Sequence, residues 1–141
     1  MSGRVYVQGA GMVRFGRYPE RTAEQLGAQA ALAALADAEL EVSAVEALYC
    51  GNLLRANDTV GQRILGEIGQ TGIPVVNVAN ACATGATAFR EAWVAVSAGI
   101  HEVCLVVGCE QMGKAGLLAA ASETPIALEG VLGSSLMPAL F

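Results

Sequence analysis

The chain has 141 residues and a formal net charge of -5 at pH 7, and 54% of its residues are hydrophobic. This length is typical of one compact domain, and so apolar a chain can bury a substantial core. The acidic balance argues against a nucleic-acid partner, because phosphate binding needs a concentration of Lys and Arg. The apolar stretches fall short of the roughly 18 continuous apolar residues of a membrane span, and no signal peptide is recognisable at the start. We therefore expect a soluble cytoplasmic protein that does not bind membranes.

The first predicted elements are a strand and a long helix. Residues 4–9 alternate apolar and polar side chains, which predicts a strand that ends in a Gly-rich turn. Thr22 and Gln25 have the spacing of a capping box, so a helix is predicted from there to about Leu40. The apolar face expected for this helix comprises Leu26, Ala30, Ala33 and Asp37, widened by Leu32 and Leu35.

The rest of the chain alternates strands with helices. Strands are predicted at 45–54, 75–79 and 103–107, and helices at 60–69 and 83–98. The last strand is almost wholly apolar, as is typical of a strand buried on both faces of a parallel sheet. Such an alternation with short connections predicts an α/β fold, in which helices cover both faces of a mostly parallel sheet.

Most of the titratable side chains have a structural explanation. The four cysteines, at positions 50, 82, 104 and 109, show no CxxC spacing, and the single His101 lacks a partner for a metal site. Cys50 and Cys104 lie within strand patterns, where free cysteine behaves as a small hydrophobe, and Cys109 follows a strand end. We therefore expect reduced thiols and no bound metal.

Cys82 differs from the other thiols in its position. It falls where the predicted strand 75–79 gives way to the predicted helix 83–98. The unpaired N–H groups of a helix N-terminus carry partial positive charge and stabilise a thiolate. The neighbouring Ala and Gly residues leave room for an acyl substrate. A buried structural cysteine in a tight turn is the alternative.

Two motifs in this part of the chain resemble those of the thiolase superfamily. They are C-A-T-G at 82–85, between a strand and a long helix, and G-C-E-Q-M at 108–112, after an apolar strand. The resemblance covers nearly the whole chain. It implies one βαβαβαβ half of a duplicated, layered α-β-α-β-α fold. Residues 1–113 would form its core, and residues 114–141 would begin the loop or cap region.

The resemblance also implies an activity. Thiolases cleave 3-oxoacyl-CoA with CoA, or form it by Claisen condensation. Cys82 would be the nucleophile that carries the acyl group as a thioester, with its own backbone N–H contributing to an oxyanion hole. Coenzyme A and acyl-CoA would be substrates, and no tightly bound cofactor is expected. Ala79 stands where many degradative thiolases have asparagine, with Asn80 next, which favours the lipid-transfer-type branch.

The activating histidine and second cysteine of the family belong to its second half, and His101 matches no family motif. We therefore expect an acyltransferase half with little turnover until another part of a longer polypeptide, or a partner chain, completes it. Assembly as a dimer or a dimer of dimers is also expected by resemblance. One alternative is a non-catalytic thiolase-like scaffold. The other is a nucleotide-binding α/β domain, suggested only by the glycines at 9 and 11, which lack the third glycine of a dinucleotide fingerprint.

Overall fold

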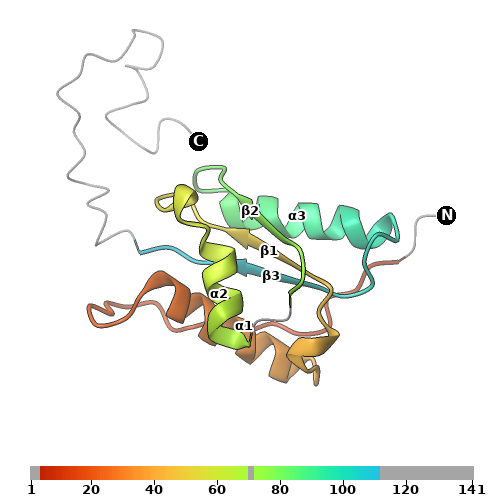
Figure 1. Cartoon of the computed structure of the whole chain (residues 1–141), viewed down its shortest axis with the longest axis horizontal. Coiled ribbons are helices and arrows are strands. Elements are labelled where there is room, and N and C mark those ends of the chain that lie inside the picture. The colour runs from red at the N-terminus through yellow and green to blue at the C-terminus, as the bar shows by residue number, and fades with distance from the viewer. Residues whose placement is uncertain (1–3, 70–71, 112–141) are drawn as a thin grey trace, which may run out of the picture. The chain divides into compact units, whose positions relative to one another are not determined.

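The protein forms a layered α/β structure, shown by a computed structural model that describes residues 4–69 and 72–111 (Figure 1). The elements in chain order are α1 (Ala23–Asp37), η1 (Val42–Ala44), β1 (Ala47–Gly51), η2 (Ala56–Asp58), α2 (Val60–Ile68), β2 (Val75–Val78), α3 (Thr84–Ser97) and β3 (Cys104–Gly108). The three strands form a parallel sheet in the order β2-β1-β3. The predicted fold class and the predicted order of these elements are therefore confirmed.

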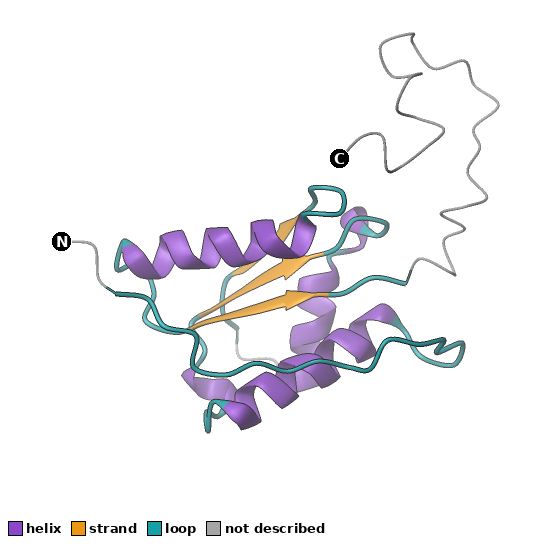
Figure 2. Ribbon diagram, turned by 180° about the vertical axis from the view of Figure 1, so that it is seen from behind, coloured by secondary structure: helices purple, strands orange, loops and turns teal. Residues whose placement is uncertain are grey.

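Helices cover both faces of the sheet. Helices α1 and α2 pack on one face and α3 packs on the other (Figures 1 and 2). The central strand β1 is buried along its whole length. Because successive side chains of a strand point to opposite faces, Leu48 and Cys50 pack toward α1 and α2 while Ala47 and Tyr49 pack toward α3.

The prediction for residues 4–9 is wrong in this structure, because this segment is extended but belongs to none of the described strands. Its last residues and the turn that follows lie alongside helix α1 instead. The Ala10 N–H donates to the Asp37 carboxylate at 2.9 Å. A Cβ atom added at Gly9 would lie 2.4 Å from the carbonyl oxygen of Ala34, and one at Gly11 would lie 2.4 Å from the nitrogen of Ala34. An alternating pattern alone does not establish a strand, because a strand also needs a paired neighbour.

Helix α1 begins as predicted but buries a different face. The Thr22 hydroxyl accepts from the Gln25 N–H at 3.2 Å, and the Thr22 N–H donates to the Gln25 side chain at 3.1 Å, so the capping box is present. The buried residues of the helix are Ala23, Glu24, Gly27, Ala28, Ala31 and Leu35, whereas Leu32, Ala33 and Asp37 are exposed. Small residues form the contact because α1 approaches α2 closely: a Cβ atom at Gly27 would lie 2.7 Å from Ile64 Cδ1.

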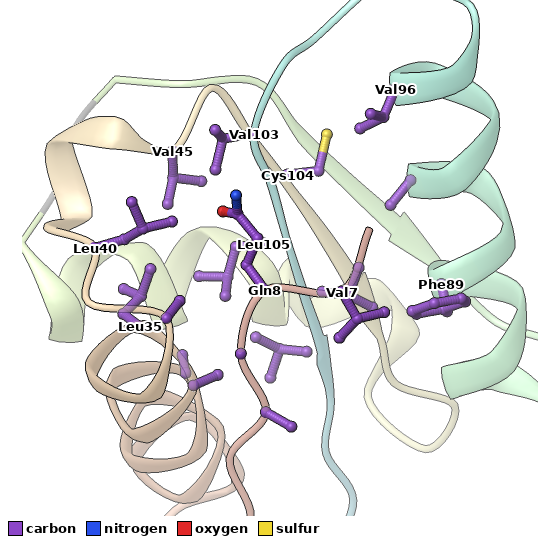
Figure 3. A pocket seen from close by; sticks show the side chains of 18 of the residues that line it. Val7, Gln8, Leu35, Leu40, Val45, Phe89, Val96, Val103, Cys104 and Leu105 are labelled. Atoms are coloured by element: carbon purple, nitrogen blue, oxygen red, sulfur yellow. The ribbon is translucent and has the colours of Figure 1, made fainter. Parts of the chain in front are cut away.

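Strand β3 is an edge strand among the described residues, and it is less buried than the sequence predicts. Leu105 and Val107 are buried toward α1 and α2, but Cys104 and Val106 on the other face are only partly buried. The unpaired edge of β3 borders a hollow of about 490 Å³ that both apolar and polar residues line. Residues 4–11 line its other side, and Phe89 and Val96 of α3 also face it (Figure 3).

Within the part of the chain that the structure describes, every helix is too short or too polar to cross a membrane.

Candidate active site

The thiol of Cys82 lies at the carboxyl-terminal edge of the sheet, in the turn that joins β2 to α3. Cys82 is exposed, and it directly precedes Ala83, the N-cap residue of α3. This is the strand-to-helix junction that the sequence predicts. In open parallel α/β sheets, ligands bind outside the carboxyl ends of the strands. The position and exposure of Cys82 therefore suit a nucleophile, and within the described residues Cys82 is not buried.

The turn around Cys82 has an unusual backbone conformation. Ala81 has a φ of 45°, in the left-handed region that residues other than glycine seldom adopt. The Ala83 N–H donates to the Asn80 carbonyl at 2.9 Å, and the Thr84 N–H donates to the Ala81 carbonyl at 3.2 Å. Neither of these bonds uses the N–H of Cys82 itself. Backbone strain of this kind is common at functional sites.

Thr84 fastens the turn with its side chain. Its buried hydroxyl accepts from the Asn80 N–H at 2.7 Å and donates to the Ala81 carbonyl at 2.7 Å. Gly51, the last residue of β1, makes room for this residue, because a Cβ atom at position 51 would lie 2.9 Å from the Thr84 carbonyl oxygen. The sequence indicated Thr84 only as part of the C-A-T-G motif, and it did not predict a role for Gly51. A glycine at the end of an apolar strand was the available signal.

The fold also brings the two motifs of the sequence together. A Cβ atom at Gly108 would lie 3.5 Å from the Cα of Gly85, so the helix that follows Cys82 packs closely on the end of β3. The Cys109 N–H donates to the Gly51 carbonyl at 3.1 Å, which extends the pairing of β3 with β1. The motif residue Met112 and the predicted loop or cap region 114–141 lie outside the described residues.

Glu110 organises the loop that follows β1. Its carboxylate accepts from the Leu53 N–H at 2.9 Å, the Leu54 N–H at 3.1 Å and the Asn52 side-chain amide at 3.2 Å. The Asn52 amide also donates to the Cys109 carbonyl at 2.8 Å. The motif glutamate therefore ties the loop after β1 to the end of β3, at the same sheet edge as Cys82.

An ion pair between the buried Glu24 and the partly exposed Arg55 anchors the far end of this loop. Both Glu24 carboxylate oxygens contact the Arg55 guanidinium, at 2.8 and 2.9 Å. Burial alone raises the pKa of Glu24. The hydrogen bonds from its own backbone, from Arg55 and from Thr22, with the positive charge of Arg55, together outweigh burial, so the pKa of Glu24 lies below its ordinary value.

We predict that Glu24→Gln destabilises the protein at pH 7 by about 1–3 kcal/mol, because Arg55 keeps its charge and loses its buried partner. A carboxylate with a lowered pKa contributes stability above its unfolded pKa of about 4.3, and that contribution is lost as the pH falls through the folded pKa. Urea unfolding should show that the difference in free energy of unfolding between wild type and Glu24→Gln becomes smaller below about pH 4. The exposed Glu67→Gln serves as control. An equal difference in free energy of unfolding at pH 7 and pH 3 would contradict the lowered pKa of Glu24.

The other thiols occupy less accessible places. Cys50 is fully buried, and the hydrogen bond with Cys109, together with burial, raises its pKa. The same hydrogen bond lowers the pKa of Cys109, which is half-buried. Burial raises the pKa of Cys104. Only Cys82 among the four thiols is exposed, which the sequence could not establish.

His101 lies at the opposite edge of the sheet from Cys82. It precedes β3, and its Nδ1 is 3.7 Å from the Glu46 carboxylate, just before β1. Since the strands are parallel, residues before β1 and β3 lie far from a residue that follows β2. His101 is therefore not placed to activate Cys82. The described residues include no group of three or more His, Cys, Asp or Glu side chains arranged to hold a metal ion.

The glycines at 9 and 11 have a structural role that accounts for them. Both lie against the backbone of α1, which fills the space that a dinucleotide pyrophosphate would need. The structure thus gives the nucleotide-binding alternative no support. The side chain of Asn80 also has a partner within the chain, because its amide donates to the Thr87 hydroxyl of α3 at 2.9 Å.

Comparison with known proteins places this geometry in a family. The family model described as "Thiolase, N-terminal domain" matches residues 5–132. Sterol carrier protein 2 of Homo sapiens is 41% identical over 118 residues, covering 81% of this chain and 21% of the relative. Benzoylsuccinyl-CoA thiolase subunit BbsB of Thauera aromatica is 36% identical over 109 residues, covering 76% of this chain and 28% of the relative.

A solved structure supports the fold. 3-Oxoacyl-[acyl-carrier-protein] synthase III from Aquifex aeolicus VF5 aligns with a TM-score of 0.63 at 20% identity, covering 67% of this chain and 32% of that chain. The chain accordingly spans about a fifth to a third of the length of the proteins that it matches.

Proposed function

The chain belongs to the thiolase family, and from this premise we propose that it supplies the N-terminal half of a thiolase-type acyl-CoA acyltransferase. The observation that carries the proposal is the exposed Cys82 in the C-A-T-G turn at the carboxyl edge of the sheet. The names of two relatives, a benzoylsuccinyl-CoA thiolase subunit and an acetyl-CoA acetyltransferase of Methanothermobacter thermautotrophicus, support acyl-CoA as the substrate class.

In the cleavage direction, the Cys82 sulfur attacks the 3-oxo carbonyl carbon of 3-oxoacyl-CoA. The adjacent carbon–carbon bond then breaks, and the released acyl-CoA carbanion takes up a proton. The acyl group, held as a thioester on Cys82, passes to the thiol of a free CoA, which regenerates the cysteine. The condensation is the same sequence in reverse. The Cys82 N–H, which the two turn bonds leave unused, would stabilise the oxyanion of each tetrahedral intermediate.

Further polypeptide must supply the base and the proton donor for this reaction. The only histidine of the chain lies at the other edge of the sheet. Large apolar side chains also remain exposed on α3, where Phe89 is 49% and Trp93 50% accessible to solvent. Exposed apolar surface of this kind marks an interface. We propose that the second thiolase half, in the same polypeptide or in a partner chain, covers this face and completes the site, and that the whole assembles into oligomers.

A non-catalytic scaffold is the second candidate, and the same exposed face of α3 favours it. A scaffold would need that interface and the half-fold, but it would not need a reactive Cys82. The two functions therefore differ in what they require of a single sulfur atom.

Selective alkylation tests the nucleophile. In the assembled, full-length protein under native conditions, iodoacetamide should modify Cys82 at least about tenfold faster than Cys50 or Cys104, because only Cys82 is exposed and lies before a helix N-terminus. Peptide mapping by mass spectrometry after timed quenching gives the rate at each position. An excess of acyl-CoA should protect Cys82 alone. If Cys82 reacted no faster than the other two thiols, the proposal would fail.

A further inference from the structure

We propose that Thr84 is a positioning residue that holds Cys82 in its reactive orientation by keeping Ala81 in the left-handed conformation. This inference rests on the proposed function, because it assigns a role toward the nucleophile of that reaction. It concerns a residue that does not touch the substrate.

The first support is the pattern of hydrogen bonds. The single Thr84 hydroxyl joins the N–H of Asn80 to the carbonyl of Ala81, at 2.7 Å each, so its two bonds span the dipeptide Asn80-Ala81. The Thr84 N–H adds a third bond, to the same Ala81 carbonyl, at 3.2 Å. The peptide group between Asn80 and Ala81 is held separately, because the Ala83 N–H donates to the Asn80 carbonyl at 2.9 Å. Together these bonds restrain the torsion angles of Asn80 and Ala81.

The second support is that Ala81 needs such restraint. Its φ of 45° brings the Cβ atom of an L-residue too close to the following carbonyl oxygen, so alanine left to itself would move to a negative φ. Cys82 is the next residue, and its Cα–Cβ bond turns with the Ala81 backbone. Relaxation of Ala81 would therefore redirect the sulfur and the Cys82 N–H together.

The third support is that Thr84 itself cannot shift easily. It is 6% accessible to solvent, and the end of β1 abuts it at Gly51, where an added Cβ would lie 3.0 Å from the Thr84 Cγ2. The sheet thus holds Thr84, and Thr84 holds the turn. Buried hydroxyl groups with both bonds satisfied are rigid connections of this kind.

The test compares four variants of the full-length protein: Thr84→Val, Thr84→Ser, Ala81→Gly and the double variant Ala81→Gly/Thr84→Val. Valine keeps the shape of threonine and removes the hydroxyl, whereas serine keeps the hydroxyl. Glycine adopts a positive φ without help. The readouts are kcat and KM for acyl transfer, the rate of Cys82 alkylation by iodoacetamide, and the fraction folded by circular dichroism.

We expect Thr84→Val to lower kcat about 10- to 100-fold, with KM for acyl-CoA changed less than about threefold, since small misplacements of a reacting group have effects of this size. Cys82 alkylation should slow in parallel at a constant folded fraction. Thr84→Ser should stay within about threefold of wild type, and Ala81→Gly/Thr84→Val should regain about tenfold over Thr84→Val.

Where Thr84→Val remains mostly folded, three results would overturn the inference: Thr84→Val retains kcat and alkylation rate, its losses match only its unfolded fraction, or the double variant is no better than Thr84→Val. If Thr84→Val does not fold, the double variant tests the inference instead. It should fold and be alkylated at Cys82, and failure to do so would overturn the inference. Failure of the proposed function is a separate outcome, seen when a variant without the Cys82 thiol keeps acyl transfer.

Discussion

Replacing Cys82 by alanine in the full-length protein should abolish acyl transfer, with kcat reduced at least about 10⁴-fold, because the variant lacks the sulfur that forms the proposed thioester intermediate. Cys82 is the only exposed thiol of the four in this chain, so none of the other three is placed to substitute for it. The measurement is the loss of 3-oxoacyl-CoA in the presence of CoA. Intact mass spectrometry with substrate alone should show an added acyl group on the wild type and none on Cys82→Ala.

The matched control is Cys104→Ala, a partly buried thiol at the start of β3, at the opposite edge of the sheet. Its activity should stay within about twofold of wild type, as is usual for a substitution away from the reacting groups. Cys82→Ala should also still bind acyl-CoA, since the alanine removes only the sulfur. Full activity in Cys82→Ala would reject the enzyme proposal and favour the scaffold.

The sequence predicted the order of the described α-helices and strands well, because each of them carries its own local signal. The capping residues Thr22 and Gln25 begin α1 as expected, and the buried Ile64, Leu65 and Ile68 of α2 follow a helical period. The strand predicted at residues 4–9 is absent, because the same alternating pattern fits any extended segment and strand pairing depends on a neighbour distant in sequence. The predicted buried face of α1 was partly wrong, because Leu32, Ala33 and Asp37 are exposed, whereas Gly27, Ala28 and Ala31 are buried together with the predicted Leu35.

For the site, the sequence located Cys82 at its junction but not the atoms that hold it there. A strand followed by a helix is a local pattern, and it is enough to place a thiol at a helix start. The roles of Gly51 and Glu110 depend on contacts with residues more than 30 positions away in the chain, Thr84 and the loop after β1. Their importance follows from the fold, which brings the ends of all three strands to one edge.

Substituting Gly51 by alanine should have the largest effect on stability at this edge. The added Cβ would lie 2.9 Å from the Thr84 carbonyl oxygen and 3.0 Å from its carbonyl carbon, and backbone atoms cannot rotate away as a side chain can. We expect a loss of about 1–3 kcal/mol in the free energy of unfolding, as is usual for overpacking. Because Thr84 must move, Cys82 alkylation should also slow by about tenfold.

Urea unfolding and timed alkylation of the full-length protein measure the two effects, and Gly66→Ala is the matched control. Gly66 lies within α2, and a Cβ atom there would meet nothing within 4 Å. The free energy of unfolding of that variant should rise by about 0.5–1 kcal/mol, because alanine has a higher helix propensity than glycine. Its Cys82 should be alkylated at the wild-type rate. If Gly51→Ala unfolded at the wild-type urea concentration, the close contact between β1 and the start of α3 would be wrong. If it were destabilised but alkylated normally, the sheet would support α3 without orienting Cys82.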